Sequence, residues 1–192
     1  MVSPEQVERE QRLTRIRQLS NAMKVVVTVI LVLISVISAL LFLLLLLPAV
    51  LDVSTGTLAL TGVDRMLDDV PVLQRLGLAA VVALAFWLLC RIFWNVRQLF
   101  CRFSEGAFFT PGTQAHILKV GTWLLAYGVF DVLSDPIGSV LLTMDNAPGE
   151  RRLELELSGS EFFFLIFGAL MIVFGWIMRE AASIAEENRH FV

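Results

Sequence analysis

Two aspartates four residues apart, Asp131 and Asp135, are the most chemically suggestive pair in this chain. They share one face of a predicted helix, because side chains four apart are neighbours on a helix surface. The helix is otherwise mostly apolar, and an ionisable side chain within a membrane span points to a proton relay, an ion ligand or a substrate contact. In the structural alternative, Asp131 pairs with Tyr127, Arg75 or a backbone group, and its neighbour lies at the membrane interface.

Four further side chains are of the types that bind zinc. They are Cys90, Cys101, His116 and His190. Their spacing matches no local metal motif, so we expect structural or incidental roles for them and no metal or cofactor. The chain also lacks a nucleophile elbow, a phosphate loop, an HExxH sequence and a paired catalytic carboxylate, which argues against an enzyme.

The elements that position these residues are set by long apolar runs. The 27 residues between Lys24 and Asp52 include no charged side chain, and the whole chain is 57% hydrophobic with only 17% charged residues. About 20 apolar residues cross a bilayer as a helix, so this run is long enough. A cleaved signal peptide is the alternative, but its apolar region would be only about 7–15 residues long.

The predicted fold class is an all-α integral membrane protein, a bundle of four transmembrane helices. The spans cover about 25–50, 72–95, 117–142 and 162–178. Residues 1–24 form a cytosolic or interfacial helix, and residues 179–192 form a polar cytosolic tail. Residues 152–157 (RLELEL) alternate with period two, which favours a strand. Residues 55–61 are the predicted partner in a small two-stranded β cap outside the membrane.

The loop between the second and third spans contains clear helix-boundary signals. Gly106 favours a turn, Thr110 suits the N-cap of the third span, and Pro111 suits its first helical position. Pro136 should kink or end that helix. We take the loop as a candidate cytosolic docking turn, formed by Glu105, Gly106, Phe108, Phe109 and Thr110.

Glycines spaced by seven residues mark a packing face on each of the last two spans. The pairs are Gly121 with Gly128, and Gly168 with Gly175. Small side chains let membrane helices approach closely, so we expect these glycines to lie between adjacent antiparallel spans.

The distribution of basic residues predicts the orientation. The two tails and the middle loop share one side of a four-span protein and hold eleven Lys and Arg residues, against four in the other two loops. The positive-inside rule therefore places both termini in the cytosol. The net charge of −3 gives no electrostatic reason for direct nucleic-acid binding.

The chain resembles the bacterial four-span inner-membrane proteins of the domain-of-unknown-function 2975 family. The resemblance is carried by residues 103–110 (FSEGAFFT), 117–121 (ILKVG) and 185–188 (AEEN). Phe109 stands where a small polar residue is expected, and His190 and Phe191 end the tail less typically. The resemblance implies a location in the bacterial inner membrane and no catalytic residues. Members are often encoded beside helix-turn-helix regulators, which implies a regulatory role by association.

These observations favour a non-enzymatic membrane sensor or regulatory partner that acts through its cytosolic face. The expected partners are the lipid bilayer, a regulatory protein and a second copy of the chain. The alternative is a small transporter or channel component that uses Asp131, in which assembly as an oligomer supplies the missing spans. An enzyme acting on lipid ranks third.

Overall fold

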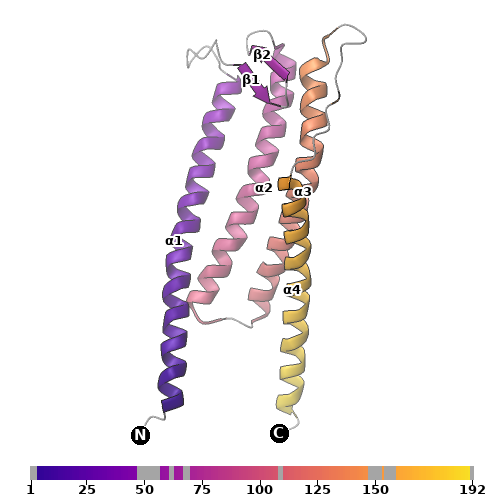
Figure 1. The fold of residues 1–192 in the computed structure, drawn as a ribbon. Coiled ribbons are helices and arrows are strands. Elements are labelled where there is room, and N and C mark those ends of the chain that lie inside the picture. Colours follow the sequence, from indigo (N-terminus) through magenta and orange to yellow (C-terminus); the bar gives the residue numbers. More distant parts are fainter. Residues whose placement is uncertain are drawn as a thin grey trace. The chain divides into compact units, whose positions relative to one another are not determined.

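The fold consists of four long α-helices and two short strands. The computed structural model describes the backbone of residues 4–46, 57–60, 63–66, 70–107, 110–146, 153 and 159–190. The helices are α1 (Pro4–Leu46), α2 (Val72–Ser104), α3 (Pro111–Thr143) and α4 (Gly159–His190), as drawn in Figure 1. Each contains a segment long and apolar enough to cross a membrane. This confirms the predicted helical class with four candidate spans.

The chain divides into two compact units, and every helix contributes a segment to both. Unit 1 comprises Met1–Val32, Arg91–Leu125 and Ile166–Val192, and unit 2 comprises Leu33–Cys90 and Ala126–Leu165. Each unit is described by itself below.

Polar contacts join the helices within unit 1. The Arg97 Nε of α2 donates a hydrogen bond to the Thr28 Oγ1 of α1 at 3.1 Å. The Gln114 Nε2 of α3 donates to the Met178 carbonyl of α4 at 3.3 Å. The buried apolar side chains of this unit lie along α1, α2 and α3, and they are Val27, Ile92, Leu99, Ile117, Val120 and Leu124.

Unit 2 contains a small apolar core. Val70, Leu78 and Leu142 form a buried cluster, and Leu141 packs against it. Leu142 is completely buried. In the same unit, the Gln74 Nε2 donates a hydrogen bond to an Asp145 carboxylate oxygen at 3.0 Å.

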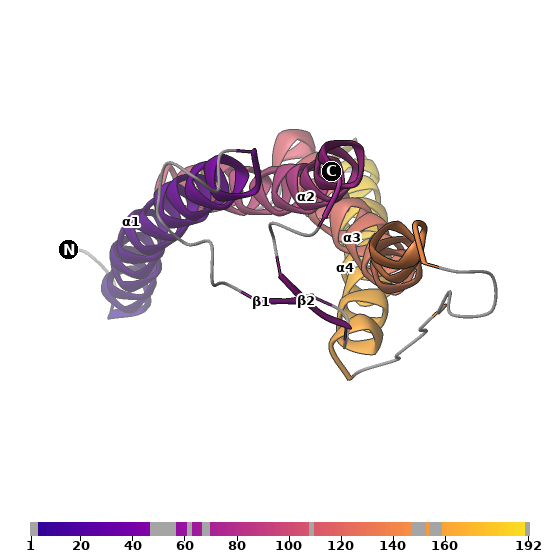
Figure 2. The ribbon, with the colours of Figure 1, turned by 90° about the horizontal axis from the view of Figure 1, so that it is seen from above.

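The two strands form a local hairpin. Strand β1 (Thr57–Leu60) pairs antiparallel with β2 (Val63–Met66), with Thr57 opposite Met66, and Figure 2 shows them side by side. The structure thus gives residues 57–60 a partner, β2, that was not predicted for them, and their predicted pairing with 152–157 stays a prediction. A partner two residues along the chain closes a far shorter loop, which costs less conformational entropy. Apart from Leu153, residues 152–157 lie outside the part of the chain that the structure describes.

Helix α3 continues through Pro136 to Thr143, so of the two predicted effects the proline does not end the helix, and a kink at this position stays a prediction. A proline removes one backbone hydrogen bond, yet membrane helices tolerate it where side-chain hydroxyls bond to nearby carbonyls. Here the Ser134 hydroxyl donates to the Asp131 carbonyl at 2.8 Å, and the Ser139 hydroxyl donates to the Pro136 carbonyl at 3.1 Å. These bonds lie on both sides of the proline.

The four helices differ in how much of their apolar surface the protein covers. Within the most apolar window of each helix, only 6% of α1 is buried, against 28% of α3. An apolar helix with so little protein around it needs an apolar solvent. Helix α1 therefore has the most apolar window of the four and is the helix that the protein covers least.

Candidate functional site

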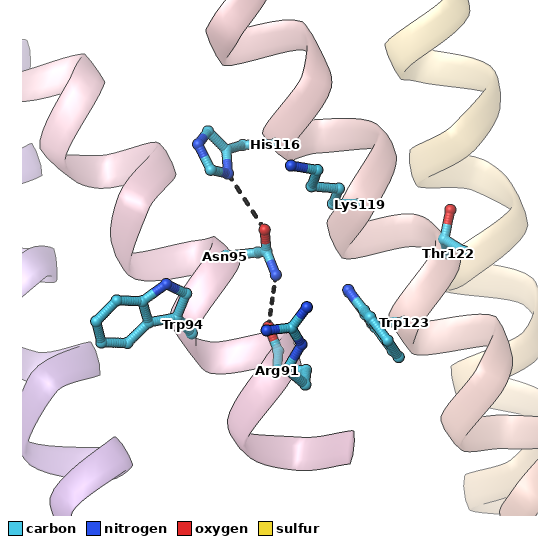
Figure 3. Close-up of a pocket in the computed structure, with 7 residues that line it drawn as sticks. All are labelled: Arg91, Trp94, Asn95, His116, Lys119, Thr122 and Trp123. Carbon is cyan, nitrogen blue, oxygen red and sulfur yellow. Dashed lines mark hydrogen bonds between the residues drawn. The ribbon is translucent and has the colours of Figure 1, made fainter. Parts of the chain in front are cut away.

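The main candidate site is an open pocket between α2 and α3 in unit 1, shown in Figure 3. Its volume is about 340 Å³. Seven side chains line it: Arg91, Trp94 and Asn95 from α2, and His116, Lys119, Thr122 and Trp123 from α3. Polar and aromatic groups therefore meet on helices that are otherwise strongly apolar.

A buried amide joins the two walls of this pocket. Asn95 is only 5% exposed. Its Nδ2 donates to the Arg91 carbonyl at 2.7 Å, which leaves its Oδ1 as the acceptor that faces His116 Nδ1 at 3.2 Å. The Nδ1 of His116 must then carry the proton of that bond. In the neutral ring, Nε2 is left as an acceptor, and in the protonated ring it is a second donor.

The charge lining the pocket is entirely positive. The Arg91 guanidinium lies 5.0 Å from the centroid of the Trp123 ring, which is within the range of a cation–π contact. The side chain of Lys119 is exposed, and among the described residues its ammonium group makes no hydrogen bond or ion pair. None of the seven lining residues is acidic. The pocket therefore attracts anions.

Helical spacing explains why these side chains converge. Arg91 and Asn95 are four apart on α2, and His116, Lys119 and Trp123 follow at intervals of three and four on α3. Such intervals keep side chains on one face of a helix. Each wall of the pocket is thus the continuous face of a single helix.

The candidate docking turn has a defined backbone structure at both ends. The amide of Gly106 donates to the Phe103 carbonyl at 3.1 Å, and the amide of Ala107 donates to the Arg102 carbonyl at 3.0 Å. This pair of bonds is the Schellman ending of a helix, and it requires a left-handed residue. Gly106 supplies that conformation, with a φ of 80°.

The start of α3 matches the predicted N-cap. The helix begins at Pro111, and the Thr113 amide lies 3.4 Å from the Thr110 Oγ1. The Thr113 hydroxyl donates back to the Ala107 carbonyl at 2.5 Å, and its side chain is fully buried. A side chain of α3 therefore stabilises the turn that precedes this helix. Of the predicted docking residues, Glu105 is exposed, whereas Phe108 and Phe109 lie outside the described residues.

Two guanidinium groups pack against the glycines at this turn. A Cβ added to Gly106 would lie 3.0 Å from an Arg17 Nη, and one added to Gly112 would lie 2.6 Å from an Arg102 Nη. The first contact joins α1 to the turn, and the second joins the end of α2 to the start of α3. Both lie in unit 1 and add positive charge there.

The predicted intramembrane pair lies in unit 2. Asp131 and Asp135 are both partly buried on α3. The carboxylates of Asp135 and Glu161 are the charges that act on Asp131, so its electrostatic neighbours are acidic. Neither of the two cavities described in this section is lined by Asp131 or Asp135.

The four residues of zinc-binding type are not brought together. Cys90 lines a second, largely apolar cavity in unit 2, with its Sγ 4.0 Å from the Ser35 Oγ. The Cys101 Sγ lies 3.9 Å from a Glu105 carboxylate oxygen, and His116 belongs to the pocket of unit 1. The side chain of His190 lies outside the described part of the chain. Within that part, no three metal-binding side chains form a cluster.

The four glycines lie where α3 meets α4. A Cβ on Gly121 would lie 2.8 Å from the Gly168 carbonyl oxygen, and one on Gly168 would lie 2.8 Å from the Leu125 amide nitrogen. Gly175 faces Leu118 in the same unit, and Gly128 faces Leu165 in unit 2. The backbones of the two helices touch most closely at Gly121.

Sequence reasoning missed the pocket of unit 1. It named neither Arg91 nor Trp94 as a site residue, and it treated His116 as a structural or incidental residue. One signal in the sequence could have indicated the pocket. His116, Lys119 and Trp123 share one face of the helix near the start of the third span. Its convergence with α2 was not visible along the chain.

Comparison with known proteins adds no relative. No family model, no curated protein and no solved structure matches this chain.

Proposed function

We propose that this protein is a non-enzymatic sensor or regulatory partner of the bacterial inner membrane that acts through unit 1. In this proposal the termini and the turn at Gly106 face the cytosol. The proposal extends the resemblance to the four-span 2975 family, whose members imply the same location.

The charge distribution supports this orientation. Unit 1 holds eleven of the fifteen Lys and Arg residues and seven of the eighteen acidic ones, so its formal charge is +4 against −7 for unit 2. Basic residues near membrane helices are retained on the cytosolic side. A green fluorescent protein fused to either terminus should fluoresce, whereas alkaline phosphatase should be active only when inserted in the first or third loop. The reverse pattern would contradict the orientation.

The observation that carries the functional proposal is the open cationic pocket of unit 1. Arg91 and Lys119 line it without any acidic residue, which is suited to receiving a ligand. The same unit presents the turn at Gly106, fixed by two backbone hydrogen bonds and by Thr113. A backbone turn fixed by these bonds, with the exposed Glu105 beside it, is suited to contact a protein partner.

Photo-crosslinking in intact membranes tests the proposal. A crosslinking amino acid at Glu105 should capture one defined cytosolic or membrane protein, and the same group at exposed Leu133 of unit 2 serves as the matched control. Replacing Phe108 and Phe109 together with Ser should abolish the capture at Glu105. If no defined protein is captured, or capture is equal at both positions, the proposal fails.

The second candidate is a small transporter or channel component, favoured by the two carboxylates near Asp131. Asp135 and Glu161 act electrostatically on it, and Glu161 is only 5% exposed. Buried acidic groups in a span are typical of proton and ion pathways. Flux in proteoliposomes should fall for Asp131→Asn and persist for Glu105→Gln. Wild-type liposomes without flux, or flux unchanged by Asp131→Asn, would eliminate this candidate.

A further inference from the structure

We propose that the pocket of unit 1 binds a phosphate group with net negative charge, supplied either by an anionic phospholipid headgroup or by a soluble phosphate compound. This inference rests on the proposed function in one respect, since it names the ligand class that the sensor would receive. It adds a binding site between α2 and α3 that the sequence did not reveal.

The first argument is the placement of charge. Arg91 and Lys119 approach the pocket from different helices, and in Figure 3 the Arg91 and Asn95 side chains point from α2 toward the side of α3 that carries Lys119 and His116. Phosphate is recognised by two or more cationic groups supplemented by neutral hydrogen-bond donors. The seven lining residues include both cations and no acidic side chain.

The second argument is the order already present in the lining. The His116 Nδ1 donates to the buried Asn95 amide oxygen, which fixes the imidazole ring relative to the cations. The Thr122 hydroxyl donates to the Leu118 carbonyl, so the attraction for an anion comes from Arg91 and Lys119. A ring that is already fixed adds no rotamers to be frozen on binding, which lowers the entropic cost.

The third argument is access and size. Arg91, Trp94, Lys119 and Thr122 are exposed, so the pocket opens on the outer surface of the helices. Arg91 ends the uncharged core of the second span, at residues 76–90, and this is the level at which lipid phosphates lie. Basic pockets between spans on the cytoplasmic side are suited to anionic headgroups. A volume of about 340 Å³ suits a headgroup or a small phosphate rather than a whole lipid.

The test uses the full chain purified in a maltoside detergent, which contains no phosphate. Native mass spectrometry measures binding of phosphatidylglycerol and of phosphatidylcholine, whose choline should be repelled. Tryptophan fluorescence and thermal stability measure binding of inorganic phosphate to the same preparation. The variants are Arg91→Gln, Lys119→Gln and the double variant, with Lys119→Arg as the charge-preserving variant. The matched control is Arg15→Gln, which removes one exposed charge of α1 within unit 1.

We expect one phosphatidylglycerol to bind about tenfold more tightly than phosphatidylcholine. One cation near a headgroup is worth about 1 kcal/mol, so each single Gln variant should weaken binding roughly fivefold and the double variant roughly thirtyfold. Lys119→Arg and Arg15→Gln should bind as wild type does. Lys119 is exposed and makes no described hydrogen bond, so Lys119→Gln should leave the melting temperature in the absence of ligand unchanged.

The outcomes separate the two sources. Binding of phosphatidylglycerol that the double variant loses assigns the site to a lipid headgroup. Binding of inorganic phosphate alone, lost in the same variant, assigns it to a soluble phosphate compound. If neither binds, or if Arg15→Gln weakens binding as much as Lys119→Gln, the inference is overturned. The assay contains no partner protein, so its failure leaves crosslinking at Glu105 unaffected, and a failure of crosslinking leaves this binding unaffected.

Discussion

The two units of this chain differ in the contacts that stabilise each of them. Unit 1 combines buried apolar side chains with hydrogen bonds between helices, from Arg97 to Thr28 and from Gln114 to the Met178 carbonyl. Unit 2 contains an apolar cluster around the completely buried Leu142 and an aromatic pair, Tyr127 and Phe164, with ring centroids 4.8 Å apart, together with the bond from Gln74 to Asp145. Directional contacts fix the positions of polar groups, which a binding site needs.

The units also differ in charge and in the kind of cavity they enclose. The cavity of unit 1 is lined by Arg91 and Lys119, whereas that of unit 2 is lined by apolar and small side chains, including Phe86 and Ala39. An apolar cavity at a lipid-exposed surface is suited to an acyl chain, while the cationic one requires an anion. The two cavities therefore differ in the chemistry of their lining, which is cationic in unit 1 and largely apolar in unit 2.

The largest expected effect is that of separating α3 from α4 in unit 1. Gly121→Leu would drive a side chain against the Gly168 carbonyl and the Ile172 amide, at which even a Cβ is too close. Backbone atoms cannot move aside as a flexible side chain does, so we expect a loss of about 3 kcal/mol in the free energy of unfolding. Unfolding by SDS titration in mixed micelles measures it. Gly159→Leu, which has open space around it, is the control.

The next effect tests the apolar core of unit 2. Leu142→Ala removes a fully buried side chain that packs against Val70 and Leu78, and we expect a loss of about 2 kcal/mol from the missing contacts. Leu133→Ala on the same helix, where the side chain is 50% exposed, should change stability by less than about 0.5 kcal/mol. Equal effects at the two positions would mean that unit 2 has no distinct core.

A smaller loss should follow from breaking one directional bond in unit 1. Thr113→Val keeps the shape of the side chain but leaves the Ala107 carbonyl without its hydroxyl donor, and we expect a loss of about 1.5 kcal/mol. The matched variant Thr122→Val removes an exposed hydroxyl that bonds only to its own helix, at the Leu118 carbonyl. Unfolding titrations that rank Thr122→Val as the more damaging would contradict this account of the turn.

The smallest effect concerns the backbone of the turn. Gly106→Ala places a Cβ on a residue with a φ of 80°, which should cost about 1 kcal/mol. Asn tolerates the left-handed region better, so Gly106→Asn should lose less. The same SDS titration compares the wild type with the two variants. A Gly106→Ala variant more stable than the wild type would show that this turn is not left-handed in the folded protein.

Local features were largely predictable from neighbouring residues. The N-cap at Thr110, the helix start at Pro111 and the glycine turn all depend on interactions within about six residues. The predicted third span, at residues 117–142, already passed through Pro136, and α3 continues through this proline to Thr143. The pairing of β1 with β2 was not predicted, because strand alternation alone does not identify a partner.

The candidate site was not predictable for a different reason. Arg91, Asn95, His116 and Lys119 have ordinary spacings on their own helices, and nothing in one helix specifies which face the next presents to it. Asp131 was predicted as a candidate site residue, because a charged side chain within an apolar run can be recognised from the sequence alone. Its acidic neighbour Glu161 belongs to α4 and was not considered.

The sequence by itself determined the number of spans, their approximate limits and the uneven distribution of basic charge, because hydrophobicity and helix length are additive along a chain. Only the tertiary structure decided which polar residues meet. The buried Asn95 joins α2 to His116 of α3, and this convergence turns two unremarkable helix faces into a cationic pocket. Such a site depends on the rotation of each helix about its axis, which is set by packing with its neighbours.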